Sequence, residues 1–214
     1  MLDYAPLHVR VSTPRLELVA ATDTLLEQLQ VLVRDGKAMA DPPPYDDPMS
    51  LYEPDPKVRL HTWLRGIWSA RGSATPDSWR LSFAVVVDEC VVGMQDVLGL
   101  QFGTHKTVTS FSWLSSTVRR AGLGTEMRHA ILHRAFDGMG ALEASSDAFV
   151  DNLGSNRVSE ALGYQPNGVE WATRNGQPGL LQRWRLTRSD WLSVRRTDIQ
   201  LYGVDACKAA LGLT

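Results

Sequence analysis

The sequence is poor in the features that mark several large classes of protein. It contains 2 cysteines in 214 residues, Cys90 and Cys207, too few for a disulfide framework or a cysteine-ligated metal site. No apolar run approaches the roughly 18 residues that a membrane-spanning helix requires, so we expect no membrane partner. The segment Met1 to Arg10 lacks the basic and then apolar plan of a secretory signal, so we expect a cytoplasmic location.

Neither sign of charge is in excess. Lys and Arg total 22 against 24 for Asp and Glu, a formal net charge of -2. A dedicated nucleic-acid-binding protein normally carries a strongly basic face or tail, so we expect no nucleic-acid partner. Hydrophobic residues make up 43% and charged residues 21%, which permits a packed core and argues against disorder. No repeat or shift in composition marks a boundary, and we predict one domain over residues 1–214.

The first third of the chain predicts short strands and two amphipathic helices. Alternating apolar residues in Leu7 to Ala20 favour one or two strands around Pro14. The stretch Thr24 to Glu27 has the form of a capping box and predicts a helix start. A second helix is predicted over Lys57 to Arg71 from its apolar spacing. The residues expected to be buried on these helices include Leu25, Leu29, Leu32, Trp63 and Trp68.

Residues 40–56 predict a loop, because six prolines interrupt any regular structure. The loop also carries Tyr45 and Tyr52, which is unusual for a simple linker. These rings could pack back on the core, or they could contact a substrate, since long loops in compact domains are often functional. We expect them to contact the substrate, and the packing alternative stays open.

The rest of the chain alternates strands and helices, a mixed α/β plan. Turns are expected at Asp88-Glu89 and at Asn175-Gly176. The expected strands are 81–87, 91–100, 108–114, 142–150, 169–174 and 181–186, and the expected helices are 125–136 and 155–162. No element is predicted for the tail, residues 188–214.

A glycine loop stands between an expected strand and an expected helix. Gly122 and Gly124 would let a ligand approach the backbone, and the first amides of the helix have no intrahelical partners. Arg119 and Arg120 add positive charge, so the loop predicts a site for an anion such as a pyrophosphate. It is not a Walker loop, since no Gly-Lys-Ser/Thr follows, and Met127 stands where a dinucleotide fingerprint needs its third glycine.

Several motifs stand around this loop in a fixed order. They are Thr13-Pro14-Arg15-Leu16, Trp113-Leu114, Arg119-x-x-Gly122-x-Gly124, Thr125-Glu126, Asn152-x-x-Ser155 and Leu162-Gly163-Tyr164. Over about residues 8–187 the sequence resembles the GNAT superfamily of acyl-CoA-dependent N-acyltransferases. Within it, the motifs resemble the branch of ribosomal-protein N-terminal acetyltransferases, and most closely an actinobacterial subgroup with some members that use succinyl-CoA. The resemblance implies an α/β fold with a mixed, mostly antiparallel sheet that is splayed at its central strands and flanked by helices.

The resemblance also implies where acyl-CoA binds. The pantetheine arm would lie between the strand ending at Leu114 and its parallel neighbour, and Ser155 would protonate the departing thiolate. Backbone groups at the end of the strand would bind the arm, amides of the loop would hold the pyrophosphate, and Asn152 would bond the pantetheine. The residues that the resemblance assigns to acyl-CoA are Trp113, Leu114, Arg119, Arg120, Ala121, Gly122, Leu123, Gly124, Thr125 and Asn152.

The chain departs from the family pattern at both expected proton-transfer groups. Many GNAT enzymes have a tyrosine where this sequence has Ser159, which leaves Ser155 as the only acid that the motifs support. The glutamate that relatives often use as a base is absent, since the matching strand reads Val108-Thr109-Ser110-Phe111. Three aspartates could replace it, and no spacing selects among them. They are Asp96, Asp147 and Asp151.

Two further features carry no expected chemistry. His129 and His133 are one helical turn apart and follow Glu126, but a fourth ligand is missing, so we expect no metal. Cys90 has no basic neighbour to lower the pKa of its thiol, and we expect it to be buried.

The sequence therefore predicts an enzyme that transfers an acyl group from acyl-CoA to an amine-bearing acceptor, either a protein or a small molecule. We expect the acetyl group of acetyl-CoA as the donor, with succinyl-CoA as the alternative. A GNAT module that binds acyl-CoA without catalysis is a second alternative. The acceptor and the oligomeric state stay open, and a homo-oligomer is compatible with the sequence.

Overall fold

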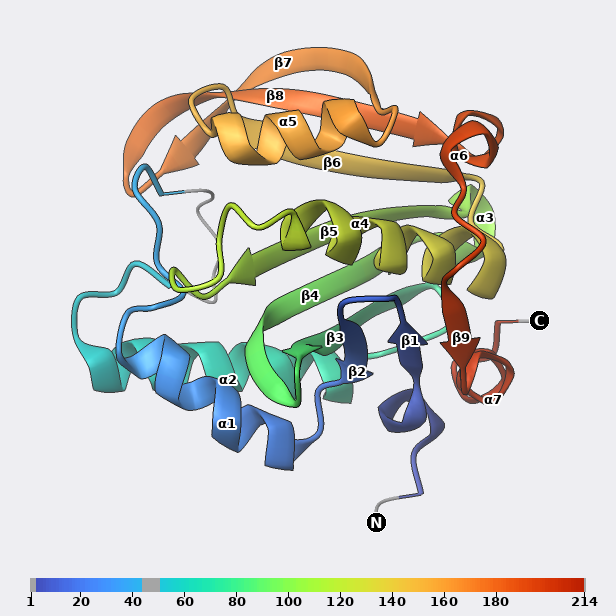
Figure 1. The fold of residues 1–214 in the computed structure, drawn as a ribbon, viewed down its shortest axis with the longest axis horizontal. Helices are drawn as coiled ribbons and strands as arrows, with labels where there is room; N and C mark the ends of the chain where they lie inside the picture. The colour runs from blue at the N-terminus through green and yellow to red at the C-terminus, as the bar shows by residue number, and fades with distance from the viewer. Residues whose placement is uncertain (1–2, 44–50, 214) are drawn as a thin grey trace.

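The computed structural model describes residues 3–43 and 51–213, which build one mixed sheet with helices on both faces (Figure 1). The strands follow the order β7-β8-β6-β5-β4-β3-β2-β1-β9. They are β1 (Arg10–Ser12), β2 (Glu17–Ala20), β3 (Ser78–Val87), β4 (Cys90–Leu100), β5 (Thr107–Leu114), β6 (Glu143–Phe149), β7 (Gln165–Arg174), β8 (Gln177–Thr187) and β9 (Gln200–Tyr202). The helices are α1 (Asp23–Arg34), α2 (Pro56–Gly72), α3 (Phe102–His105), α4 (Leu123–His133), α5 (Leu153–Ala161), α6 (Arg188–Val194) and α7 (Val204–Ala210). A 3₁₀ turn, η1 (Ala5–His8), and a π-helical turn, η2 (Arg134–Gly138), complete the described elements.

Every strand pair in the described part of the sheet is antiparallel except β5 with β6. These two central strands run parallel and share only three register pairs, the last joining Thr109 to Ser145. Beyond that pair both strands continue without facing each other, so the sheet splays open at its centre. The expected α/β fold, mostly antiparallel and splayed, is confirmed.

Helix α1 begins two residues earlier than the sequence predicts. The side chain of Thr22, not Thr24, accepts a hydrogen bond from the Leu25 amide at 3.4 Å and caps the helix. The buried face is correspondingly shifted, and the predicted face of Leu25, Leu29 and Leu32 is wrong at its two ends. The buried residues are Leu26, Leu29 and Val33.

Helix α2 starts at Pro56, where the preceding Asp55 side chain accepts from the amides of Lys57 and Val58. Trp63 is fully buried, as predicted. Trp68 is 49% exposed and does not belong to the core; its indole N–H points instead toward Asp23, at 3.4 Å from the carboxylate.

Two tight hairpin turns confirm the turn predictions. Asp88 and Glu89 have φ values of 47° and 63°, and Asn175 and Gly176 have 51° and 74°. Two successive positive φ values are those of a type I′ turn, whose twist matches the flanking strands. The first turn has a consequence for Cys90, which begins β4 immediately after it and is exposed. The prediction that Cys90 is buried is wrong, because Cys90 lies at the end of the hairpin, where Asp88 and Glu89 are exposed as well.

The two faces of the sheet support separate apolar cores. Side chains of successive residues on a strand alternate between the faces, so Phe83 and Val85 join one core while Ala84 joins the other. The first core packs against α4 and the C-terminal tail, and the second packs against α1 and α2. Figure 1 shows α1 and α2 side by side, apart from α4 and α5.

The tail, for which the sequence predicts nothing, is folded onto the domain. Strand β9 pairs antiparallel with β1, with Leu201 opposite Val11, and extends the sheet by one strand. Helix α7 buries Cys207 in the first core, where its sulfur accepts a hydrogen bond from Arg134 at 3.3 Å. Among the described residues, no helix combines the length and the apolarity needed to cross a membrane.

Candidate functional site

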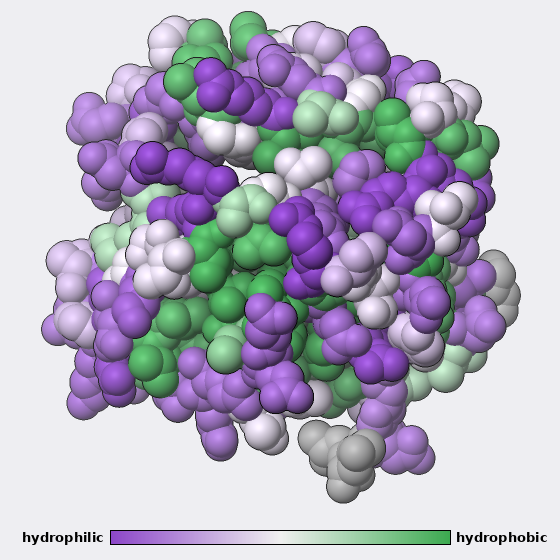
Figure 2. Space-filling view, viewed as in Figure 1, coloured by the Kyte–Doolittle hydropathy of each residue, from purple (hydrophilic) through white to green (hydrophobic). Residues whose placement is uncertain are grey.

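The gap between β5 and β6 forms the centre of the site. Because pairing stops at Thr109 and Ser145, the ends of both strands leave backbone groups facing the gap. A cavity of about 660 Å³ occupies it. Figure 2 shows the molecule hollowed on this face, in the region where Figure 1 places α5 above the start of α4. The residues that line the cavity include Ala38, Ala40, Asp41, Pro42, Ser110, Phe111, Ser112, Trp113, Leu114, Arg119, Arg120, Gly122, Gly124, Thr125, Met127, Arg128, Asp147, Asp151, Asn152, Leu153, Gly154, Ser155 and Val158.

The glycine loop lies at one end of this cavity. Gly122 has a φ of 78° and stands at the N-cap position of α4, with no side chain to cap the helix. The amides of the first helical turn therefore have no intrahelical acceptors, and the helix dipole places partial positive charge there. Arg120, with a φ of 65°, is exposed and also lines the cavity. This end is built to receive an anion.

The Arg119 side chain forms structural hydrogen bonds that could not be predicted from its sequence position. Its Nε donates to the carbonyl of Leu114 at 2.9 Å, and Nη2 donates to the carbonyls of Ala38 and Met39 at 3.1 and 2.8 Å. The side chain thereby joins the end of β5 to the segment after α1. Arg119 shapes the cavity wall as well as adding positive charge to it.

The loop is also held from the N-terminal segment, through Glu126 in the first turn of α4. The Thr13 hydroxyl donates to this carboxylate at 2.6 Å, and Arg15 donates from its amide at 3.0 Å and from Nε at 2.5 Å. Arg15 also donates to the carbonyl of Ala121 at 3.0 Å. Burial alone would raise the pKa of Glu126, but the hydrogen bonds from Thr13 and Arg15 and the charge of Arg15 hold that pKa below its usual value. Glu126 is therefore a buried carboxylate, 4% exposed, that fixes the loop.

At the other wall of the cavity, Asn152 caps α5. Its side-chain oxygen accepts from the amide of Ser155 at 3.1 Å. Ser155 is thus the third residue of a nine-residue helix, within the positive end of its dipole. Both side chains belong to residues that line the cavity.

Comparison with known proteins identifies the family to which this arrangement belongs. Residues 15–165, well over half of the chain, match the model of the acetyltransferase (GNAT) domain. The chain belongs to the GNAT acetyltransferase family. It is therefore an acyl-CoA-dependent N-acyltransferase by family.

Solved structures support the same fold at low sequence identity. RimL, a ribosomal L7/L12 alpha-N-protein acetyltransferase in complex with coenzyme A, is 17% identical with a TM-score of 0.65, over 82% of this chain and 95% of that one. The microcin C7 self-immunity acetyltransferase MccE, in complex with acetyl-CoA and AMP, is 15% identical with a TM-score of 0.62, over 81% and 93%. The spermidine/spermine N-acetyltransferase SpeG from Vibrio cholerae is 12% identical with a TM-score of 0.62, over 85% and 99%. The acceptors in these names differ widely, so the shared fold does not select one.

The structure brings most of the residues assigned by the GNAT resemblance into one cavity, with exceptions. Leu123 is buried in the core beneath the loop, and Ala121 is exposed; neither stands among the described residues of the lining. Ser159, at the position where many GNAT enzymes have a tyrosine, is fully buried and cannot reach a ligand. Ser155 stays the candidate acid.

The segment expected to contact the acceptor is described only in part. Tyr45 lies outside the described residues. Tyr52 is half-buried just before α2 and is not among the described residues that line the cavity. The earlier part of the same segment does line it, at Ala40, Asp41 and Pro42.

The tip of the β7–β8 hairpin meets this segment. Arg174 donates to the carbonyl of Pro43 at 3.4 Å and forms two hydrogen bonds with Asp151, at 2.7 and 2.8 Å. The pKa of the Arg174 guanidinium is raised, chiefly by the hydrogen bonds to Asp151. Arg174 therefore connects three walls around the cavity. Sequence reasoning missed it, because its partners are 23 and 131 positions away.

Arg128 is a second residue of the site that sequence reasoning missed. It is 5% exposed, lines the cavity, and donates from Nη1 to the Ser146 hydroxyl at 2.9 Å. Its position was available in the sequence, since Arg128 stands four residues after Gly124 and shares its helix face. It is the buried cation nearest in sequence to the glycine loop.

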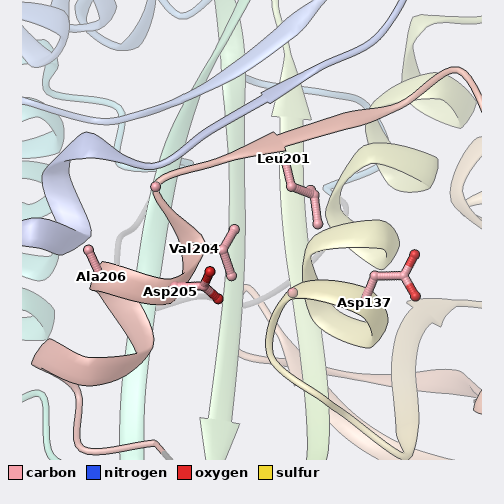
Figure 3. A pocket seen from close by; sticks show the side chains of 7 residues that line it. Asp137, Leu201, Val204, Asp205 and Ala206 are labelled. Carbon is pink, nitrogen blue, oxygen red and sulfur yellow. The ribbon is translucent and has the colours of Figure 1, made fainter.

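Two other places in the described structure bring polar groups together. The pKa values of His129 and His133 are both lowered by burial, that of His133 to about 4, and no group of three or more metal-ligating side chains occurs among the described residues. A smaller cavity of about 320 Å³ lies between η2 and the segment from Leu201 to Ala206 (Figure 3). Its Asp137 side chain is already paired with Arg188 and Arg195.

Proposed function

We propose that this protein transfers an acyl group from acyl-CoA to a primary amine, with both substrates bound at once in the cavity between β5 and β6. One observation carries the proposal: the gap between the splayed strands opens directly onto the uncapped N-terminus of α4. A single cavity can therefore hold an extended arm and its terminal phosphates. Since the donor is an acyl-CoA, we place the reaction in the cytoplasm.

In this proposal the pyrophosphate accepts hydrogen bonds from the backbone between Arg120 and Thr125. Arg119 and Arg120 supply positive charge, and the pantetheine arm pairs with the open edge of β5 at Trp113 and Leu114. The Asn152 oxygen is engaged in capping α5, so its carboxamide N–H₂ group is the part that would bond the pantetheine.

Ser155 is proposed to protonate the departing thiolate. A serine hydroxyl is a weak acid in water, but this one lies in the first turn of α5, where the helix dipole favours negative charge. The dipole would stabilise the thiolate as the carbon–sulfur bond breaks, and the Ser155 proton would then neutralise it. Ser155 would regain a proton from the acceptor nitrogen, relayed through water.

The acceptor is proposed to enter from the side of residues 40–43. The described lining of the cavity carries the carboxylates of Asp41, Asp147 and Asp151, and Arg174 links Asp151 to the carbonyl of Pro43. Negative charge on the acceptor side suits an amine that arrives as an ammonium ion. Tyr45 and Tyr52, on the continuation of this segment, are proposed to contact the acceptor. A protein N-terminus, a lysine or a small polyamine would each satisfy this chemistry.

The acetyl group is the proposed donor, and one observation favours succinyl as a second candidate. A succinyl group carries a carboxylate that must be paired inside the cavity, and Arg128 is a buried cation in the lining. If Arg128 pairs with that carboxylate, Arg128→Met lowers kcat/KM for succinyl-CoA and leaves that for acetyl-CoA unchanged.

The proposal is tested by coenzyme A release. The protein is incubated with acetyl-CoA or succinyl-CoA and three amines: a peptide with a free N-terminal serine, an Nα-blocked lysine peptide, and spermidine. We expect amine-dependent release of coenzyme A with at least one pair. Tight binding of acyl-CoA by calorimetry without release for any pair would instead identify a binding module without catalysis.

A further inference from the structure

The glutamate that GNAT relatives often use as a base is absent from this chain. The three aspartates that could replace it have different surroundings in the structure. Asp151 is exposed, and its pKa is lowered chiefly by the hydrogen bonds from Arg174. Asp96 is buried in an ion pair with Arg80, with Nε at 2.9 Å, and is not among the described residues that line the cavity. Asp147 alone of the three lines the cavity without such a close ion pair, since its nearest cationic group, Nε of Arg183, lies at 3.7 Å.

Asp147 stands at the point where the sheet opens. It follows Ser145, the last β6 residue paired with β5, by two positions, so the edge of β6 beside it faces the gap. Side chains alternate along the strand, and the intervening Ser146 faces α4 and bonds Arg128. Asp147 therefore points to the opposite face of the sheet, the one on which α1 and α2 pack against β3 and β4. An acyl-CoA on the α4 side and an amine from the other side would meet beside it.

We propose that Asp147 is the general base that takes a proton from the ammonium group of the acceptor. The inference rests on the proposed function, which it deepens by assigning the missing proton acceptor. The carboxylate oxygen Oδ1 is buried and has no hydrogen-bond partner among the described residues, so it is available to an N–H group that enters the cavity.

The surroundings of Asp147 suit this task. Burial raises the pKa of its carboxyl; the charge of Arg183 acts in the opposite direction, and that of Glu170 raises the pKa further. Arg183 is itself shared, because its Nη1 donates to Glu170 at 3.1 Å, and Arg128 supplies positive charge from the α4 side. A carboxyl with a raised pKa is a stronger base toward an ammonium ion.

The proton balance is complete with two groups. Asp147 takes one proton from the ammonium ion, and the neutral nitrogen forms a bond to the thioester carbonyl carbon. The carbon–sulfur bond then breaks with its electron pair leaving on sulfur, and Ser155 donates its proton to the thiolate. The nitrogen loses its second proton to Ser155 through water, and Asp147 releases its proton to solvent.

The test compares Asp147→Asn with Glu143→Gln. Glu143 lies on the same strand and the same face, and it too is paired with an arginine of β8, Arg185 at 2.5 Å, but it is outside the described lining of the cavity. We expect Asp147→Asn to lower kcat/KM for the amine by about 10²–10⁴-fold with the Kd for acetyl-CoA unchanged, and Glu143→Gln to change neither. The wild-type rate should fall as pH falls through the pKa of Asp147, and this limb should vanish in the Asn variant.

Each outcome supports or overturns the role of Asp147. Equal loss in both variants, or an Asn variant with full activity and an intact acid limb, overturns the role of Asp147 while the acyltransferase proposal stands. If Asp147→Asn does not fold, Asp147→Glu, which moves the carboxylate by one methylene, must still lower kcat at constant Kd. Wild-type protein that binds acetyl-CoA but releases no coenzyme A with the serine peptide, the lysine peptide or spermidine overturns both proposals.

Discussion

Arg15 and Glu126 are 111 residues apart in the sequence and meet at 2.5 Å in the structure, between the Arg15 Nε and the Glu126 carboxylate. The contact explains why two of the sequence motifs occur together. The Thr13-Pro14-Arg15-Leu16 segment supplies the donors, and Thr125-Glu126 supplies the acceptor in the first turn of α4. The N-terminal segment thus holds the helix end that we propose binds the pyrophosphate.

Replacing Glu126 by Gln should reduce both stability and acyl-CoA binding. Hydrogen bonds to a charged group contribute about 1.5–3 kcal/mol each. Gln keeps one accepting oxygen, so the free energy of unfolding should fall by about the value of one such bond. Urea unfolding measures the first effect and calorimetry the second. Arg34→Gln, which breaks an exposed ion pair with Asp35, is the control and should change neither.

The same pair predicts a pH dependence with a definite sign. The pKa of Glu126 is lowered in the folded protein, so the unfolded chain binds more protons as pH falls below about 4.5. The stabilisation is present above this pH and is lost below it. The difference in melting temperature between wild type and Glu126→Gln should therefore narrow in acid, and a difference that is constant with pH would contradict the ionised pair.

His133 should add a second pH dependence in a higher range. Burial lowers its pKa to about 4 in the folded protein, against an ordinary value of 6.5, so the unfolded state binds the proton more readily between these values. Stability should fall as pH falls from 6.5 to 4, by up to about 3 kcal/mol from this group. Wild type and His133→Phe should diverge across this range in urea unfolding, the Phe variant being the less sensitive to pH. Parallel curves would show that His133 titrates normally.

Gly122→Ala should weaken acyl-CoA binding by tenfold or more. The left-handed backbone at φ 78° disfavours a side chain, and an added Cβ would lie 3.2 Å from the Arg15 guanidinium, beside the amides that face the ligand. Gly140→Ala has the same backbone penalty at φ 74°, with open space around it and no place in the cavity lining. Calorimetry with coenzyme A should show loss of affinity in the first variant and normal affinity in the second.

Ser155→Ala should lower kcat by about 10–100-fold, the lower part of the range for general acids, because water can replace the hydroxyl in part. The Kd for acyl-CoA should change little. Ser159→Ala is the matched control on the same helix, since Ser159 is fully buried and away from the cavity. Unchanged kcat in Ser155→Ala, with chemistry shown to limit the rate, would leave Ser155 with only a structural role.

Arg174→Ala should raise KM for the acceptor more than the Kd for acyl-CoA. The variant loses the bonds to Asp151 and Pro43 that join the hairpin tip to the acceptor side of the cavity. Arg185→Ala, which removes an arginine of the neighbouring strand outside the described lining, should leave KM normal. A weakened affinity for acyl-CoA with normal KM would place Arg174 on the donor side instead.

Patterns that depend on nearby residues predicted the structure best. The hairpin turns at Asp88-Glu89 and Asn175-Gly176 and the strand–glycine loop–helix order follow from local chemistry, and the structure has them. The predicted N-cap of α1 is wrong by two residues. Thr22 and Thr24 can both cap a helix, and the packing of Leu26 and Val33 selects Thr22. No element could be predicted for the tail, because β9 forms its hydrogen bonds with β1, about 190 positions earlier.

Residues whose roles depend on distant partners could not be assigned from the sequence. The sequence does not distinguish Asp96, Asp147 and Asp151. In the structure they differ in burial, in their position relative to the cavity and in the arginines that lie beside them. The burial of Ser159 in α5 and the exposure of Cys90 beside its hairpin turn likewise depend on tertiary packing. Most of the residues that the family motifs assign to acyl-CoA line one cavity, and their role in binding stays a prediction.

The pairing of β9 with β1 matters to anyone who trims this protein for expression. The family match ends at residue 165, and a chain cut soon after β8 would keep nearly every residue of the cavity lining. It would also lose the strand beside β1, and β1 leads directly into Thr13 and Arg15, the residues that hold Glu126. Such a shortened protein should bind coenzyme A more weakly, because the edge of β1 would be exposed on the far side of the molecule. The residues that line the cavity would all still be present.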